Sequence, residues 1–132
     1  MYLVDTSVWL DFFRARRSGA VLRFEEILDH GAPFGITGMI YQEVLQGAAS
    51  EEDCSRLASF LGTQIFYRPL DAIESYRKAA GLYFRCRRHG VTIRSTVDCL
   101  VANIAIEHGL VLLHNDRDYV QMAKVVRELK LA

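Results

Sequence analysis

The feature that most restricts how this chain can fold is the alternation of short apolar segments with helical patterns, with no hairpin turn between successive apolar segments. The candidate strands are Tyr2–Val4, Phe34–Thr37, Gln64–Tyr67 and Leu110–Leu113. Each is short and apolar or β-branched, and longer stretches with helical spacing separate them. Strands separated in this way pair in parallel through right-handed crossovers, so the pattern predicts an open α/β sheet covered by helices on both faces.

The helical patterns have recognisable ends. They are expected at Ser7–Arg17, Val21–His30, Met39–Ala49, Glu51–Leu61, Asp71–His89 and in the segment STVDCLVANIAIEHG that starts at Ser95. Gly31, Gly90 and Gly109 suit helix C-termini, and Thr37 suits an N-cap. The long fifth pattern carries its apolar residues along one face, namely Ile73, Tyr76, Ala80 and Tyr83.

Length and composition limit the class of protein. A chain of 132 residues is expected to form one domain, residues 1–132. Its 16 basic residues balance 16 acidic ones, so any electrostatic function must come from local segregation of charge. The three cysteines lack a C-x-x-C pair, which argues against a disulfide framework or thiolate zinc site and favours a reducing cytoplasm. No basic leader or bilayer-spanning apolar run is evident, so neither export nor membrane insertion is expected.

Four acidic residues lie beside apolar segments: Asp5, Glu43, Asp98 and Asp116. Each has an ordinary structural interpretation when taken alone. Asp5 suits a helix cap, and Glu43 suits a polar helix face. Asp98 stands three residues after Ser95, at the spacing of a capping box, and Asp116 suits a turn. Taken together, however, the predicted topology brings Asp5, Asp98 and Asp116 to one edge of the sheet, beyond the carboxyl ends of the strands, where ligands bind in such folds.

Clustered carboxylates need a counter-charge. At a separation of roughly 6 Å, two carboxylates repel by about 3 kcal/mol at an effective dielectric constant near 20. An all-oxygen set without histidine or cysteine selects a hard divalent ion, Mg²⁺ or Mn²⁺, which commonly completes its shell with phosphate oxygens. The acids therefore point to metal-assisted hydrolysis of a phosphodiester.

A basic segment precedes Asp98. Between Ser75 and Val97 the chain contains six basic residues and no acidic one; they are Arg77, Lys78, Arg85, Arg87, Arg88 and Arg94. Aromatic residues lie between them. One interpretation is a surface that binds RNA or DNA phosphates without reading bases. The other is a solvated helix face whose aromatic residues lie in the core.

Four motifs in order resemble those of the PIN-domain ribonucleases, and specifically the VapC-type toxins of bacterial type II toxin–antitoxin pairs. They are VDTSVWLDFF, YQEVLQG, RSTVDCLVANIAIEHG and LLHNDRDY. The resemblance spans Leu3 to about Ala123. It implies a three-layer α/β/α fold with a central parallel sheet of four to five short strands, the fifth being a short edge strand around Glu128–Leu131.

The resemblance also implies a set of site residues. By position, the family's catalytic and metal-binding acids fall on Asp5, Glu43, Asp98 and Asp116. Asp118 matches the second acid of the terminal D-x-D-aromatic motif, where it either binds metal or caps the next helix. Thr6 and Ser95 match hydroxyl residues that orient the site. His114 departs from the small hydroxyl residue of many relatives; it is an outer donor, a pH-sensitive neighbour or, as we expect, an exposed residue.

The function implied by the resemblance is an endoribonuclease that uses Mg²⁺ or Mn²⁺, leaves a 5′-phosphate and inhibits translation and growth when free of its antitoxin. Its implied partners are RNA, a second copy of the chain and a VapB-type antitoxin whose C-terminal segment crosses the acidic groove. Arg85, Arg87, Arg88 and Arg94 are the expected RNA contacts. Two alternatives remain: a phospho-acceptor receiver-like domain, and a non-catalytic adaptor that retains the fold.

One expectation concerns a single side chain. If the acids share a cation, the carboxylate of Asp5 should face Asp98 and Asp116 across a cation-sized gap. Asp5 should then not turn back onto the helix that follows it, and Thr6 or Ser7 should take the capping role.

Overall fold

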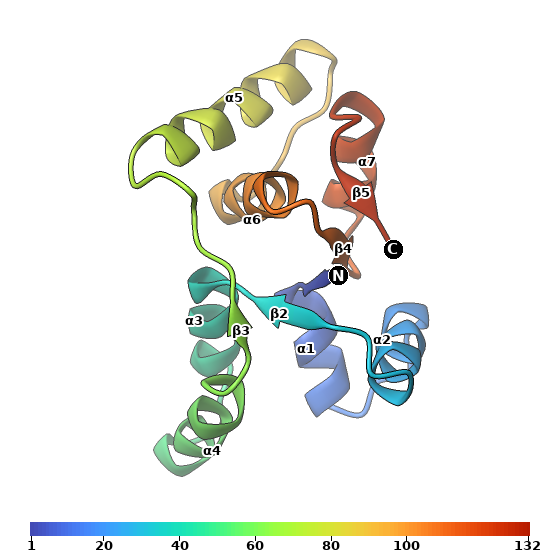
Figure 1. The fold of residues 1–132 in the computed structure, drawn as a ribbon, viewed down its shortest axis with the longest axis vertical. Coiled ribbons are helices and arrows are strands. Elements are labelled where there is room, and N and C mark those ends of the chain that lie inside the picture. The colour runs from blue at the N-terminus through green and yellow to red at the C-terminus, as the bar shows by residue number, and fades with distance from the viewer.

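The computed structural model describes all of residues 1–132 and shows a five-stranded parallel sheet between two layers of helices (Figure 1). The strands are β1 (Tyr2–Val4), β2 (Phe34–Ile36), β3 (Ile65–Phe66), β4 (Val111–Leu113) and β5 (Lys130–Leu131). They lie in the order β3-β2-β1-β4-β5, and every pairing is parallel. The predicted three-layer α/β/α fold is confirmed, and so is its short fifth edge strand.

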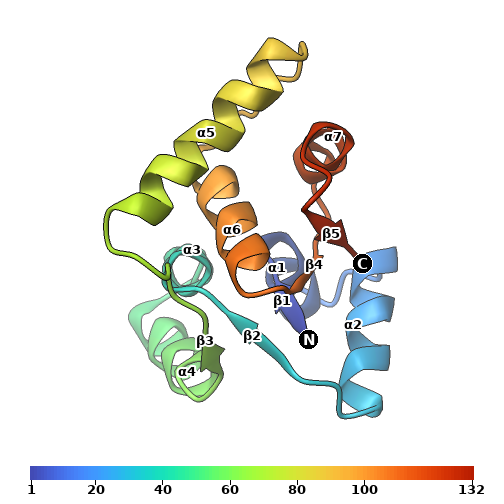
Figure 2. The same cartoon turned by 45° about the horizontal axis from the view of Figure 1, so that its top comes forward.

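Seven helices cover the sheet. They are α1 (Thr6–Phe13), α2 (Gly19–Asp29), α3 (Gly38–Gln46), α4 (Glu51–Leu61), α5 (Glu74–Arg88), α6 (Thr96–Glu107) and α7 (Arg117–Val125). Helices α1 to α4 pack together on one side of the sheet, and α5 to α7 pack on the other (Figures 1 and 2). The seventh helix, α7, lies outside the six predicted patterns. None of the helices is both long and apolar enough to span a membrane.

Helix boundaries follow the local backbone. Gly31, Gly90 and Gly109 have φ of 65°, 75° and 63°, which confirms them as residues that end helices. The first helix is shorter than predicted, because Ala15 adopts a φ of 55° that no right-handed helix continues. The fifth helix starts later than predicted, because the Asp71 side chain accepts the backbone N–H groups of the residues two and three positions after it. These hydrogen bonds form a turn before the helix.

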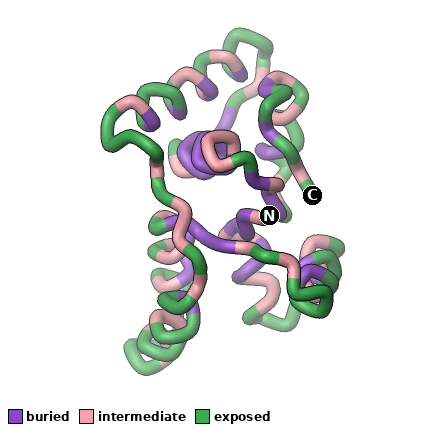
Figure 3. The backbone as a smooth tube through the Cα atoms, in the orientation of Figure 1, coloured by how far each residue is buried: buried purple, intermediate pink, exposed green.

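The core lies between the sheet and the inner helices. Helix α6 is buried along every residue from Cys99 to Ala105, and most of its tube is purple in Figure 3. On the other side, Trp9 is 1% exposed, and its indole N–H donates to the Val4 carbonyl at 3.1 Å, so this large side chain is buried without an unpaired polar group. Removing it should cost about 3 to 5 kcal/mol.

The predicted apolar face of α5 is not the face that packs on the core. The buried positions of this helix are Ser75, Ala79, Leu82 and Cys86. Ile73 and Tyr76 are 79% and 53% exposed. Three of these four residues are small, which permits close packing on α6, and the helix leaves Tyr76 and Phe84 exposed on its surface.

The strand order reverses at β1. The chain leaves β1 toward β2 and β3 on one side and reaches β4 and β5 on the other. Connections after β1 and β4 therefore run to opposite faces of the sheet, and in open α/β sheets ligands bind beyond the carboxyl ends of the strands at such a point. This topological switch point positions the site described next.

Candidate active site

Asp5 and the segment after β4 meet at the switch point. Asp5 follows β1 directly, and its backbone N–H donates to the Leu113 carbonyl at 2.9 Å. His114, Asn115 and Asp116 continue from β4 at the same edge. The site is thus fixed by the sheet itself, because the two contributing strands are hydrogen-bonded neighbours.

The Asp5 carboxylate is divided between two roles. Its Oδ2 atom accepts the backbone N–H of Ser7 at 3.1 Å and the Ser7 hydroxyl at 2.6 Å, so Asp5 is the N-cap of α1. The prediction that Thr6 or Ser7 takes the cap is wrong, because the helix begins immediately after the strand and only Asp5 has extended backbone there. Its Oδ1 atom instead accepts the Tyr119 hydroxyl at 3.1 Å. One oxygen stabilises the helix, and the other faces the site.

Asp98 lies in the first turn of α6 and is half-buried. Ser95 is the N-cap of this helix, but its side chain forms no capping hydrogen bond, so the alternative of a capping box is wrong. Burial, followed by the charges of Asp5 and Asp116, raises the pKa of Asp98 from 3.8 to about 7. Its carboxylate receives one hydrogen bond, from the Tyr119 hydroxyl at 3.3 Å.

Tyr119 was not among the predicted site residues. Its side chain is fully buried in α7, and its hydroxyl lies between the carboxylates of Asp5 and Asp98. Burial and these two carboxylates raise the pKa of Tyr119 well above its ordinary value, so the hydroxyl stays protonated as a donor. The D-x-D-aromatic motif contained the signal, because the aromatic residue follows the second acid directly.

Asp116 and Asp118 both lie within ion-pair distance of the Arg94 guanidinium. Asp118 is buried, and its Oδ2 atom accepts both the backbone N–H and the Nε–H of Arg94 at 3.2 Å. The Arg94 Nη2 atom lies 3.8 Å from Asp116 Oδ1. Asp116 is the N-cap of α7 and accepts the Asp118 N–H at 2.9 Å, so the alternative in which Asp118 caps this helix is wrong.

Glu43 reaches the same edge from α3. Its Oε1 atom accepts the Thr6 hydroxyl at 2.7 Å. Because Thr6 directly follows Asp5, this bond links Glu43 to the start of α1, next to Asp5. Glu43 thus belongs to the acidic edge, although it is not among the charges that act most on Asp98.

His114 is half-buried, so the expectation of an exposed residue is wrong. Its Nδ1 atom accepts the Asp116 N–H at 3.1 Å, and its ring packs against Tyr119 with 5.3 Å between ring centroids. Burial lowers the pKa of His114, although Asp5 and Asp116 oppose the effect. The neutral ring therefore supports the backbone of one acid and the aromatic ring that contacts two others.

The donor set matches a hard cation. Asp5, Asp98 and Asp116 offer only oxygen, and Asp5 and Asp98 form no ion pair with any basic side chain. No three His, Cys, Asp or Glu side chains converge on one point as they are oriented here. Burial is the main cause of the raised pKa of Asp98, and the negative charges of Asp5 and Asp116 add to it. Oxygen ligands with uncompensated charge are the chemistry that Mg²⁺ and Mn²⁺ require.

The basic segment before Asp98 is partly neutralised. Arg85 pairs with Glu128 at 2.8 Å, and Arg94 pairs with the site acids. Arg87 and Arg88 are exposed and form no ion pair. Of the four predicted RNA contacts, these two have the most freely available charge.

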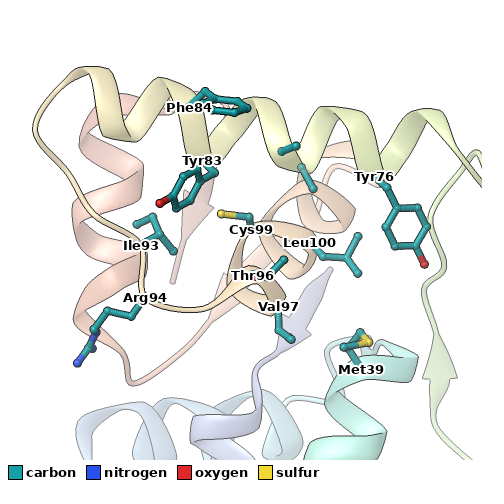
Figure 4. Close-up of a pocket in the computed structure, with 12 residues that line it drawn as sticks. Met39, Tyr76, Tyr83, Phe84, Ile93, Arg94, Thr96, Val97, Cys99 and Leu100 are labelled. Atoms are coloured by element: carbon teal, nitrogen blue, oxygen red, sulfur yellow. The ribbon is translucent and has the colours of Figure 1, made fainter.

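An apolar groove lies beside the acidic edge, between α5 and α6 (Figure 4). It has a volume of about 700 Å³, and Tyr76, Tyr83 and Phe84 contribute aromatic rings to its wall. Tyr76 and Phe84 are 53% and 57% exposed and are surface residues, whereas Tyr83 is half-buried and packs against the core. Arg94 lies at the edge of the groove and points away from its apolar side chains (Figure 4).

A parallel α/β/α sandwich with acids gathered at the β1–β4 switch point is the arrangement of a PIN-like domain. The PIN domain family matches residues 2–125, and the chain belongs to this family. Within it, the chain is 36% identical over 126 residues to VapC ribonuclease Mb1587 of Mycobacterium bovis and to ribonuclease VapC11 of Mycobacterium tuberculosis, with 95% of this chain and 93% of each relative covered. The resemblance to VapC-type PIN domains is thereby confirmed.

A solved structure agrees at the level of the fold. VapBC2 from Rickettsia felis, bound to a DNA fragment from its promoter, matches with a TM-score of 0.72 at 18% identity. The match covers 99% of this chain and 96% of that one. The whole domain is therefore shared, including the strands that position the acids.

Proposed function

We propose that this protein is an endoribonuclease that depends on Mg²⁺ or Mn²⁺ and acts as the toxin of a VapBC-type toxin–antitoxin pair. The similarity to relatives named VapC ribonuclease supports an activity on RNA. The acidic edge supports the metal. The free thiols of all three cysteines agree with action in the cytoplasm, where the RNA substrate is found.

The observation that carries the proposal is the electrostatic state of Asp98. Asp98 is a half-buried carboxylate beside Asp5 and Asp116, and its only hydrogen-bond donor is neutral. This arrangement destabilises the fold, so stability alone does not explain it. Asp5, Asp98 and Asp116 would hold the ion, with Glu43 and Asp118 at its flanks. A bound ion would lower the pKa of a water nucleophile and offset the charge that grows on the phosphoryl oxygens.

Neighbouring side chains would keep the acids in position. Tyr119 orients the inner oxygens of Asp5 and Asp98, and Thr6 orients Glu43. Such outer hydrogen bonds restrict the rotamers of metal-binding carboxylates and sharpen the site. Ser95 stays a proposed member of this group, since its hydroxyl does not cap α6. Arg87 and Arg88 would hold the RNA backbone by its phosphates, and the product would carry a 5′-phosphate.

We propose two protein partners. The VapC relatives and the VapBC assembly support a VapB-type antitoxin, whose C-terminal segment would cross the acidic edge and block it. A second copy of the chain would cover the apolar groove of α5 and α6, because its exposed aromatic rings are typical of the centre of a protein interface. Release from the antitoxin would then inhibit translation and growth.

The direct test is cleavage of total RNA by the purified chain, with and without Mg²⁺. We expect cleavage only with the ion, loss of cleavage in EDTA, and at least a hundredfold loss in D98N, the order expected when a group that acts on the reacting charge is removed. D29N, which removes an exposed carboxylate on α2, is the matched control and should cleave normally. Equal activity of D98N and the parent chain would refute the metal site.

The partner is tested in cells. Induced expression of the chain alone should stop growth, and co-expression of a small basic-tailed protein encoded beside it should restore growth and co-purify with the chain. Growth unaffected by the intact chain would favour the adaptor alternative instead.

A further inference from the structure

Arg94 is the basic side chain that contacts the acidic edge. It pairs with Asp118 through Nε and lies within ion-pair distance of Asp116 through Nη2. The remaining acids of the edge, Asp5, Glu43 and Asp98, form no ion pair. The single resident positive charge therefore neutralises one side of the cluster.

The two partners differ in exposure to solvent. The Arg94 side chain is 71% exposed, whereas the Asp118 side chain is 12% exposed. The backbone N–H of Arg94 also donates to Asp118, so this acid keeps a hydrogen bond when the guanidinium leaves. The guanidinium points away from the apolar side chains of the groove (Figure 4), and the exposure of the Arg94 side chain leaves it open to solvent.

From this geometry we infer that Arg94 is an internal counter-cation, which occupies Asp116 and Asp118 in the metal-free protein and is displaced when a divalent ion binds. The inference rests on the proposed function, because it assigns a competitor to the same metal site. Two cations that use the same carboxylates bind at each other's expense, so the guanidinium weakens the affinity for the ion. Once displaced, the same side chain is free to contact a phosphate of the RNA.

This assignment refines the predicted role of Arg94. A residue that only holds RNA would have no effect on metal affinity. A competing residue changes metal affinity in the opposite direction to RNA affinity, since its removal strengthens the first and weakens the second. The two readouts together separate a counter-cation from a simple phosphate contact.

Arg117 offers a matched control. It stands between Asp116 and Asp118 in the sequence, is exposed and forms no ion pair with either. R117Q therefore removes the same charge from the same neighbourhood without removing a contact. R94K is the second control, because it keeps the charge but loses the Nε–H that bonds Asp118.

The experiment is titration of the full chain with Mn²⁺ alone, followed by the decrease in the free-ion signal in electron paramagnetic resonance. We expect R94Q to bind Mn²⁺ on the order of tenfold more tightly than the parent chain, R94K to fall between them, and R117Q to change by less than about twofold. R94Q should also bind single-stranded RNA more weakly in the presence of saturating Ca²⁺.

The outcomes separate the two claims. If the parent chain binds Mn²⁺ and D98N does not, the metal site stands; equal or weaker binding by R94Q, or the same gain in R117Q, then overturns the counter-cation alone. If the parent chain and D98N bind Mn²⁺ equally, or neither binds it, both the metal site and the counter-cation are overturned.

Discussion

The buried hydroxyl of Tyr119 donates to Oδ1 of Asp98 at 3.3 Å, and no other side chain donates to that carboxylate. The same hydroxyl lies 3.1 Å from Oδ1 of Asp5. A single proton thus lies between two carboxylates, which come from the end of β1 and the start of α6. This shared donor links the sheet edge to the helix and leads to the first prediction.

We expect Y119F to lower the free energy of unfolding of the metal-free protein by about 1 to 2 kcal/mol, because both carboxylates lose a buried donor. Urea denaturation in EDTA measures this change. Y83F is the matched control, since Tyr83 is half-buried and its hydroxyl forms no hydrogen bond. A cost for Y83F as large as that for Y119F would assign the effect to packing.

Asp98→Asn should stabilise the metal-free protein at pH 8. A carboxyl whose pKa rises from 3.8 to about 7 on folding binds more protons in the folded than in the unfolded state between these values. The free energy of unfolding therefore falls as pH rises through that window. Full realisation of the shift would be worth roughly 4 kcal/mol, but partial exposure screens it, and we expect a gain of about 2 kcal/mol.

The gain of D98N should shrink as the pH is lowered toward 4, where Asp98 is protonated in the folded protein. Denaturation of both proteins in EDTA from pH 4 to pH 8 measures it, with D29N as the control that should change by less than about 0.5 kcal/mol. A constant difference across this range would show that the carboxylate does not carry the expected charge penalty.

Thr6→Val should slow RNA cleavage by about tenfold while leaving the fold intact, because it removes the 2.7 Å hydrogen bond that orients Glu43. Valine has nearly the same shape as threonine, so the packing at the start of α1 is kept. Cleavage rates at saturating Mg²⁺ are the measurement. T92V, at an exposed threonine, should cleave at the parent rate; a T6V variant that also cleaves at the parent rate would show that the Thr6 hydroxyl does not orient the site.

The unpaired arginines of α5 should set the salt dependence of RNA binding. Removing both charges in the R87Q/R88Q double variant should lower the slope of log affinity against log salt by about 1.4, the value for two phosphate contacts to a single strand. R85Q should have a smaller effect, because Glu128 already neutralises Arg85. Filter binding across a salt series measures the slopes, and an unchanged slope for the double variant would exclude this surface.

Phe84→Asp should dissociate the proposed homodimer, because it places a charge in the aromatic wall of the groove between α5 and α6. Sedimentation velocity over a range of concentrations should report a dimer for the parent chain and a monomer for F84D. L22D, at an exposed leucine on α2 in the opposite helix layer, should stay dimeric. A parent chain that sediments as a monomer would refute the dimer itself.

Much of the fold was predictable from local pattern. The parallel α/β/α architecture and the strand positions followed from the alternation of apolar segments with helices, and the glycine helix ends were confirmed by positive φ. Where prediction failed, the sequence was not informative. Ala15 adopts positive φ without being glycine, and α5 shows that aromatic residues at helical spacing mark an exposed face as readily as a buried one.

The sequence by itself determined which chemistry is available: oxygen ligands at the ends of predicted strands and helices, and a basic segment beside them. Only the tertiary structure decided how each side chain is used, because that depends on which donors reach it from other elements. Asp5 caps a helix as well as lying in the site. The Tyr119 hydroxyl lies between two acids, and Arg94 pairs with Asp118. The Asp5 cap is a local contact, but the contacts of Tyr119 and Arg94 span 21 to 114 residues of chain, and no local pattern encodes them.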